Sequence, residues 1–223
     1  MNWLPYGPHA WLFQFAERLG EEAFARGCAI AADLERHPPP GLVEYVPAFT
    51  TILLEFDPHE MPPPEELLPE LVRRFEQAAT TRIEPAAVRE IPVRYDGPDL
   101  DRVAQTNGIT VAEVCARHAA TVYRVYMLGF APGFPYLGDL DPRLHTPRLP
   151  SPRTRVAAGS VAIGGEHTGI YTVDSPGGWN IIGHTEVKIF DPARGAPAGA
   201  DEEMCWLKQG DRVKFVPLQS EGA

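Results

Sequence analysis

The chain has few lysines and no long apolar run, and each shortage excludes a class of function. Of its 223 residues only Lys188, Lys208 and Lys214 are lysines, so arginine supplies the other basic side chains. The formal net charge of −10 argues against a nucleic-acid or anionic-membrane surface, because phosphates attract the opposite sign. No apolar window approaches the ~20 residues of a bilayer span. We therefore expect no nucleic-acid and no membrane partner.

Cysteine is also scarce: the three cysteines, Cys28, Cys115 and Cys205, lie far apart and form no CxxC pair. This usage favours a reduced, cytoplasmic protein. Residues 1–9 show no basic region followed by an apolar run, so we expect no signal peptide. The seven histidines have no HExxH-type spacing, and we predict no metal site.

Nucleotide-binding motifs are missing as well. No G-x-x-x-x-G-K-S/T sequence occurs, and the glycines of residues 159–165 have no lysine beside them. No G-x-G-x-x-G follows an expected strand. The sequence therefore identifies no self-contained nucleotide site.

What the chain does contain is 24 prolines and 20 glycines in a periodic apolar background, which indicates many turns. In the N-terminal part the pattern predicts the order β-α-β-β-α, over residues 10–16, 21–36, 42–46, 50–56 and 65–79. This order is most of a ferredoxin-like module. A strand over residues 88–95 could complete it or begin the next domain. We place the boundary near Glu84–Pro85, between domains of residues 1–85 and 86–223.

The C-terminal part is predicted to be mainly β. Two short helices come first, and a capping box of Thr110 and Glu113 opens the second. Short strands bounded by Gly, Pro or Asp follow, over residues 123–130, 159–164, 169–173, 179–183, 186–190 and 211–217. This spacing favours a barrel or sandwich, so the fold class is α+β.

Residues 128–138 concentrate three Gly, two Pro and three aromatics. Gly permits close backbone approach and Pro stiffens the loop, so Phe130, Phe134 and Tyr136 could line an apolar cleft. The alternative is a tight barrel corner filled by its own aromatic side chains.

Arginine is enriched just downstream. Residues 128–165 contain four Arg against two Asp, a net charge of +2 in an acidic chain. Arg153 and Arg155 are two residues apart, so on an extended backbone both point to one face. Two guanidiniums side by side could bind a carboxylate or phosphate. The alternative is a solvated loop whose arginines pair with surface acids.

Residues 173–185 hold three further candidates. Ser175 precedes a Pro-Gly-Gly turn whose amides could bind an anion, and Trp179 offers either a stacking surface or a core plug. His184 could act as acid or base, although a lone His is more often structural. Ser175 does not sit in a nucleophile elbow, because Val173 occupies the place of the required Gly. A triad of Ser175, His184 and Asp174 stays open.

Taken together, the residues from Arg124 to Thr185, including LGFAPGFPYLGDL and VDSPGGWNIIGHT, resemble the 5-oxoprolinase B-subunit family (PxpB, also called KipI). This family was long described as allophanate hydrolase subunit 1. Weaker agreement covers nearly the whole chain, including residues 45–48, 91–95 and 210–217. One departure is Gly7-Pro8-His9, where the family commonly has an acidic or small polar residue after the Gly.

The resemblance implies an N-terminal α+β domain and a C-terminal cyclophilin-like β-barrel. It also implies two partner proteins, the 5-oxoprolinase C subunit (PxpC, KipA-like) and the A subunit. With them the family carries out ATP-dependent opening of 5-oxoproline to glutamate. The chain would be inactive alone, and ATP would act at the level of the complex.

Two other roles follow from resemblance or analogy. The alternative within the family is inhibition of a sensor histidine kinase by direct binding. A peptidyl-prolyl isomerase is suggested only by analogy of the barrel, and a fold alone does not carry a function.

The resemblance also supplies site residues. We expect Arg155 to stabilise phosphoryl charge on the lactam oxygen and His184 to move a proton, as catalytic residues. Together with Arg153, the other matching positions would bind substrate: Gly129, Phe130, Pro132, Gly133, Phe134, Tyr136, Ser175, Gly177, Gly178 and Trp179.

Overall fold

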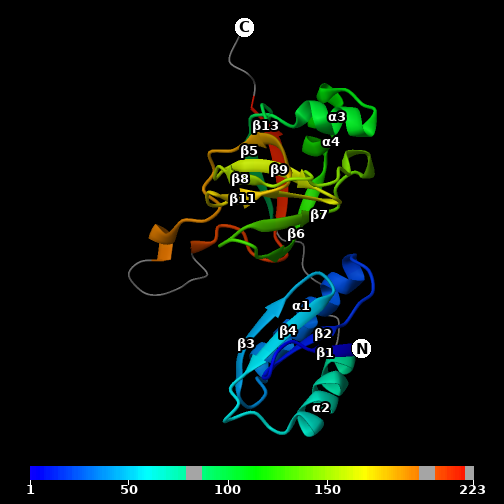
Figure 1. The fold of residues 1–223 in the computed structure, drawn as a ribbon, viewed down its shortest axis with the longest axis vertical. Coiled ribbons are helices and arrows are strands. Elements are labelled where there is room, and N and C mark those ends of the chain that lie inside the picture. Colours follow the sequence, from blue (N-terminus) through cyan, green and yellow to red (C-terminus); the bar gives the residue numbers. More distant parts are fainter. Residues whose placement is uncertain (79–86, 196–203, 219–223) are drawn as a thin grey trace. The chain divides into compact units, whose positions relative to one another are not determined.

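The computed structural model describes residues 1–78, 87–195 and 204–218 (Figure 1). The chain divides into two compact units, Met1–Glu84 and Pro85–Ala223. The domain boundary predicted near Glu84–Pro85 lies outside the described residues and stays a prediction. No helix in the described part of the chain is both long and apolar enough to cross a membrane.

The N-terminal unit is a four-stranded antiparallel sheet covered on one face by two helices. Its elements are β1 (Asn2–Pro5), β2 (Ala10–Gln14), α1 (Glu21–Arg36), β3 (Leu42–Pro47), β4 (Thr51–Phe56) and α2 (Pro64–Gln77). The strand order is β1-β2-β4-β3. Alternate residues of β2 and β4 meet apolar residues of both helices in one core, which includes Phe13, Leu54, Ile30, Leu71 and Phe75. The period of two in the strands and the helical period in α1 and α2 account for this layer.

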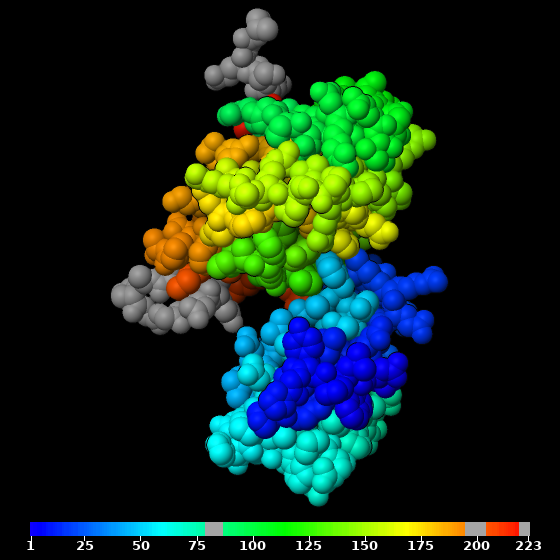
Figure 2. All heavy atoms as spheres, in the orientation of Figure 1, coloured from blue at the N-terminus to red at the C-terminus, as the bar shows by residue number. Residues whose placement is uncertain are grey.

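The complete ferredoxin-like module is not confirmed. β2, α1, β3 and β4 do form a split β-α-β arrangement, because β4 lies between β2 and β3 and is antiparallel to both. The strand after α2, β5 (Val88–Val93), instead pairs in parallel with β13 (Arg212–Pro217) in the C-terminal unit. The edge beside β2 is taken by β1, which precedes it. β1 is short and fully exposed along its length (Figure 2, dark blue), so it carries no period of burial for the sequence to show.

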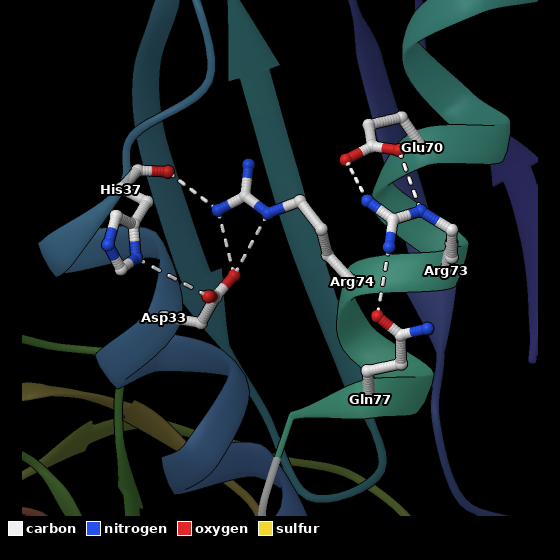
Figure 3. Close-up of polar contacts among 6 residues, drawn as sticks. All are labelled: Asp33, His37, Glu70, Arg73, Arg74 and Gln77. Carbon is white, nitrogen blue, oxygen red and sulfur yellow. Dashed lines mark hydrogen bonds and ion pairs between the residues drawn. The ribbon is translucent and has the colours of Figure 1, made fainter.

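Polar contacts join the two helices of this unit (Figure 3). Arg74 of α2 donates to Asp33 of α1 at 2.8 Å and to the carbonyl oxygen of His37 at 2.6 Å. Arg73, one residue earlier, binds Glu70 and Gln77 of its own helix and lowers the pKa of the Glu70 carboxyl through hydrogen bonding. Arg74 thus ties α2 to the end of α1, whereas the exposed Arg73 contacts add little stability.

On the face of this sheet away from the helices, an apolar row crosses all four strands. The register places Leu4 beside Leu12, Leu12 beside Leu53, and Leu53 beside Val46. Leu4 and Val46, at the two ends of the row, are 65% and 45% exposed. The sheet therefore has one buried face and one that carries apolar side chains at its surface.

The C-terminal unit contains a seven-stranded sheet of order β12-β9-β10-β7-β6-β13-β5 and a separate pair, β11-β8. Its other elements are α3 (Leu100–Asn107), α4 (Val111–Ala120), β6 (Val122–Leu128), β7 (Pro135–Gly138), η1 (Pro142–Leu144), β8 (Arg153–Val156), β9 (Ser160–Gly164), β10 (His167–Ile170), β11 (Ser175–Gly177), β12 (Asn180–His184) and η2 (Pro192–Gly195). Helices α3 and α4 contact each other at one end of the sheet (Figure 1, green).

The seven-stranded sheet closes on itself into a nearly complete barrel. Arg94, just after β5, exchanges two backbone hydrogen bonds of 2.9 Å with His184 at the end of β12. Gly97 lies so close to β12 that an added Cβ would overlap the carbonyl of Ile181. The two edge strands are thereby joined, and the predicted barrel is present as a nearly closed sheet. Its assignment as cyclophilin-like stays a prediction.

Two sequence predictions for this unit had opposite outcomes. The capping box is confirmed: Thr110 Oγ accepts from the Glu113 amide at 3.2 Å, and the Glu113 carboxylate accepts from the Thr110 amide at 2.8 Å. The strand predicted over residues 186–190 is wrong, because that segment has no regular structure. Thr185 Oγ accepts from the Val187 amide at 3.2 Å, a local turn contact that competes with strand pairing.

The barrel core is apolar except for one histidine delivered by α4. His118 is fully buried, stacks on Phe215 at 4.5 Å and hydrogen-bonds Tyr95 and Thr168, each at 2.8 Å. Burial lowers the pKa of His118 to about 3, so its ring is neutral at physiological pH. Both ring nitrogens have partners, which makes His118 a satisfied structural residue.

Candidate functional site

A small pocket of about 80 Å³ lies in the C-terminal unit, outside the barrel core. Aromatic side chains form most of its wall, which is made by Phe130, Phe134, Tyr136, Arg148, Tyr171, Gly177, Gly178 and Trp179. One water needs about 10–15 Å³ of such space, so the pocket accepts a group the size of a small ring. The Gly- and aromatic-rich segments singled out in the sequence therefore meet at one place.

The loop before β7 sets the first wall of the pocket. Phe130 has a φ of 69°, an unusual left-handed conformation for a bulky residue. The turn is closed by hydrogen bonds from the Phe134 amide to the Ala131 carbonyl and from the Gly129 amide to the Phe134 carbonyl. As a result Phe130 stays 61% exposed while Phe134 is buried. Backbone strain of this kind is often stored at functional sites.

Phe134 is the centre of the aromatic cluster. Its ring contacts four others edge-on, at centroid distances of 5.0 Å to Tyr136, 5.3 Å to Tyr171, and 5.5 Å to both Phe130 and Trp179. Edge-to-face contacts of this kind place the rings roughly perpendicular to one another. They form the walls of a box rather than a flat stack.

Trp179 is held by the fully buried Asn180 that follows it. The Asn180 side-chain amide donates to the carbonyls of Pro147 and Ile163 at 3.1 and 3.0 Å, and its oxygen accepts from Arg102 at 2.9 Å. The arrangement satisfies the whole side chain, as buried amides require. The Leu149 amide also donates to the Gly178 carbonyl at 2.7 Å. The residues on both sides of Arg148 are thus tied to the segment that carries Trp179.

Arg148 is the cation of the pocket wall. Its guanidinium carbon lies 5.8 Å from the centroid of the Trp179 ring, a cation–π contact. Its side chain makes no hydrogen bond or ion pair to any of the described residues. Burial raises the pKa values of the Tyr136 and Tyr171 phenols, and the Arg148 charge acts in the opposite direction on both. The box therefore has neutral walls and one positive charge.

The two arginines predicted to form a joint anion clamp have separate carboxylate partners instead. Arg153 donates to the buried Asp99 at 2.8 Å, and Arg155 donates to Asp174 at the surface at 2.6 Å. Neither lines the pocket. The alternation of side chains along β8 does apply, but each guanidinium already has a carboxylate. The substrate-binding and catalytic roles of Arg153 and Arg155 stay predictions.

His184 and Ser175 also lie away from the pocket wall. His184 ends β12, whereas Trp179 immediately precedes its first residue, and the imidazole Nε2 is 3.4 Å from Glu186. Asp174 accepts from Arg155 and from the Ala158 amide, so the structure does not assemble a Ser-His-Asp triad. Ser175 Oγ is buried without a hydrogen-bond partner in the described structure. The catalytic role of His184 stays a prediction.

Of the residues expected to bind substrate, the pocket brings six together: Phe130, Phe134, Tyr136, Gly177, Gly178 and Trp179. Gly129, Pro132 and Gly133 shape the loop that carries Phe130, and the Pro132 carbonyl accepts from Thr172 at 2.6 Å. The apolar surface patch expected for kinase binding is not present as such, because Phe134 and Trp179 are 2% and 5% exposed.

Sequence reasoning missed two wall residues, Arg148 and Tyr171. Arg148 stood in the Arg-rich stretch, but nothing in its spacing marked it above Arg153 and Arg155. Tyr171 follows β10 directly, and only long-range folding shows that its ring reaches Phe134 and Phe130. Among the described residues, no group of three or more His, Cys, Asp or Glu side chains is arranged to hold a metal ion.

Comparisons with known proteins cover most of the chain. The signature of the carboxyltransferase domain, subdomain C and D, matches residues 1–199. The B subunit of 5-oxoprolinase from Bacillus subtilis (strain 168) is 37% identical over 227 residues, which is 96% of this chain and 92% of the relative.

Two solved structures are similar over nearly the whole chain. TTHA0988 is 42% identical with a TM-score of 0.78, and the match covers 95% of this chain but 40% of that longer one. The urea carboxylase of Kluyveromyces lactis, at 22% identity and a TM-score of 0.81, is matched over 97% of this chain and 22% of its own length, and shares the fold alone. The pocket, the fold and the sequence agreement place the chain in one family: it belongs to the B subunits of 5-oxoprolinase, built on carboxyltransferase subdomains C and D.

Proposed function

We propose that this chain is the B subunit of an ATP-dependent 5-oxoprolinase that hydrolyses 5-oxoproline to glutamate together with the A and C subunits. The near full-length agreement with the Bacillus subtilis relative supports the reaction class. In the structure, the observation that carries the proposal is the aromatic box around Phe134, because its size and neutral walls suit a small planar lactam.

The chain supplies binding rather than a complete reaction centre in this proposal. It has no phosphate-binding motif, so ATP is used by the assembled complex. The residues predicted to stabilise phosphoryl charge and move a proton, Arg155 and His184, do not line the box. A catalytic role for them requires a surface completed by another protein of the complex, in agreement with an inactive isolated chain.

Reconstitution tests this function directly. The purified chain is mixed with the A and C subunits from its own organism, and ATP- and 5-oxoproline-dependent release of glutamate is measured. We expect activity only when all three are present. Glutamate release without this chain, or none with all three under ATP, would contradict the proposal.

A pocket variant links the activity to the box. Phe130→Ala removes an exposed wall residue, so the fold tolerates the change and kcat/KM for 5-oxoproline falls about tenfold. Leu218→Ala is the matched control, because Leu218 is also an exposed apolar residue of the C-terminal unit, 46% exposed. Equal effects of the two changes would separate the activity from the pocket.

A further inference from the structure

Arg148 combines three properties that a recognition residue needs. It lines the pocket, its side chain is exposed, and its guanidinium has no ionic partner among the described residues. The neighbouring Arg153 differs, because Asp99 already neutralises it at 2.8 Å. In a chain of net charge −10, Arg148 therefore provides the local positive charge of this pocket.

The position of Arg148 is set by its neighbours on both sides. The Pro147 carbonyl accepts from Asn180, and the Leu149 amide donates to the Gly178 carbonyl. The guanidinium lies over Trp179, which leaves its N–H edges directed around the ring rather than consumed by a protein acceptor. A planar fork held in this way is preorganised for a carboxylate, since little side-chain entropy is left to lose.

We propose that Arg148 binds the carboxylate of a cyclic amide substrate whose ring occupies the aromatic box. This specificity role rests on the proposed function, because 5-oxoproline joins a five-membered lactam ring to a single carboxylate. The ring contacts the neutral walls around Phe134, and the carboxylate meets the guanidinium at the exposed rim. Arg148 thus selects lactam amino acids over cyclic amides that have no carboxylate.

The substrate's two parts match the two parts of the site in cost as well as in shape. The lactam loses little on leaving water for a box with polar tyrosine groups, whereas a carboxylate is costly to bury. Placement of the carboxylate at the rim lets it keep part of its hydration and still gain a charge-assisted hydrogen bond. Such a bond corresponds to a gain in affinity of roughly 10- to 100-fold.

The test compares two ligands that differ only in the carboxylate. In the reconstituted complex, steady-state kinetics with 5-oxoproline are measured for the wild type, Arg148→Gln and Arg148→Lys, with 2-pyrrolidinone as a competing ligand. We expect Arg148→Gln to raise KM for 5-oxoproline roughly 10- to 100-fold with kcat changed only a few-fold. The inhibition constant of 2-pyrrolidinone stays the same, and Arg148→Lys recovers part of the loss.

Arg143→Gln is the matched control, because Arg143 is an exposed arginine of the same unit that does not line the pocket. It should leave both ligands unaffected. Equal loss of 5-oxoproline and 2-pyrrolidinone binding in Arg148→Gln would show that Arg148 only supports the Trp179 wall and would overturn the proposal. An unchanged KM would overturn it as well.

A second measurement separates this inference from the proposed function. Calorimetric titration of the isolated full chain with 5-oxoproline and with 2-pyrrolidinone does not depend on turnover. Binding of 5-oxoproline that is lost in Arg148→Gln, in a chain that supports no glutamate release when reconstituted, would keep the recognition role and reject the reaction. Glutamate release that is indifferent to Arg148 would keep the reaction and reject the recognition role.

Discussion

The two units of this chain use a β-sheet in opposite ways. The N-terminal sheet stays open: helices α1 and α2 cover one face, and the other carries the apolar row from Leu4 to Val46. The C-terminal sheet closes through the contact of Arg94 with His184, so its inner face becomes a sealed core. A sealed core leaves ligand binding to the loops and the outer surface.

The aromatic pocket follows from this closure. Phe134, Tyr171 and Trp179 form a cluster of their own, distinct from the barrel core that contains Tyr123 and Phe215. The barrel therefore acts as a rigid support on which a second, smaller apolar cluster is built around the ligand site. The open sheet of the N-terminal unit has one core and no aromatic cluster of this kind among its described residues.

The largest effect is expected where the barrel closes. Gly97→Ala should destabilise the C-terminal unit by about 3 kcal/mol, because the new Cβ would overlap backbone atoms of Ile181 and Ile182 that cannot rotate away. Gly129→Ala is the control, since its added Cβ would meet only the flexible end of Met127, at 3.5 Å. Urea unfolding combined with peptide-resolved hydrogen exchange measures both variants.

The comparison of the two sheets depends on that result. If the seam closes the barrel, Gly97→Ala raises exchange in β5 and β12 before it affects the strands of the N-terminal unit. Equal stability of Gly97→Ala and Gly129→Ala would mean that the edge strands are joined too loosely to distinguish a closed sheet from an open one.

A smaller effect concerns pH, because the barrel core contains a histidine and the N-terminal core is apolar. Burial lowers the pKa of His118 to about 3 in the folded state, whereas an unfolded His titrates near 6.5. Above pH 6.5 both states are neutral and His118 has no pH-linked effect. As the pH falls from 7 to 5 only the unfolded state gains the proton, so stability drops by about 2 kcal/mol.

The His118→Gln variant isolates this contribution. The substitution lowers stability overall but removes the part of the pH dependence that His118 causes between pH 6.5 and 3. Unfolding free energies of both proteins at pH 7, 6 and 5 provide the measurement, and His59→Gln, in an exposed turn of the N-terminal unit, serves as the control. Parallel pH curves for the wild type and His118→Gln would assign the dependence to other groups.

Local patterns predicted local structure in both units. The strand at residues 10–16 and the helix at 21–36 correspond to β2 and α1, and the capping box at Thr110 opens α4. These features depend on neighbours within a few residues, which the sequence displays directly. β1 and the failed strand at residues 186–190 depend instead on which edge is free and on one side-chain contact of Thr185.

The site was predicted in part for the same reason. The Gly-, Pro- and aromatic-rich segments were visible, and they do supply most of the pocket wall. The choice among the arginines was not visible, because it depends on acids distant in sequence: Asp99 is 54 residues from Arg153, and Asp174 is 19 residues from Arg155. Arg148 is distinguished by the lack of such a partner among the described residues, a property that only the folded chain displays.

The two paired arginines give the smallest and most discriminating difference. Arg153 and Asp99 are 31% and 9% exposed in their side chains, and Asp99 also accepts from the Ile181 amide at 2.7 Å. Arg153→Met therefore leaves a nearly buried carboxylate without its charge partner at the barrel seam, at a cost of about 1.5 kcal/mol. Arg155 and Asp174 are 77% and 46% exposed, so Arg155→Met should change stability by less than about 0.5 kcal/mol.

Salt sharpens the contrast between these two pairs. An exposed ion pair is screened at high ionic strength, whereas the partly buried pair at the seam is screened less. The difference between Arg153→Met and the wild type should therefore persist at an ionic strength of about 0.5 M, and the small effect of Arg155→Met should vanish. Unfolding curves of both variants at low and high salt decide the matter. If Arg155→Met destabilises the barrel as much as Arg153→Met, Asp174 rather than Asp99 is the acid that supports the closed sheet.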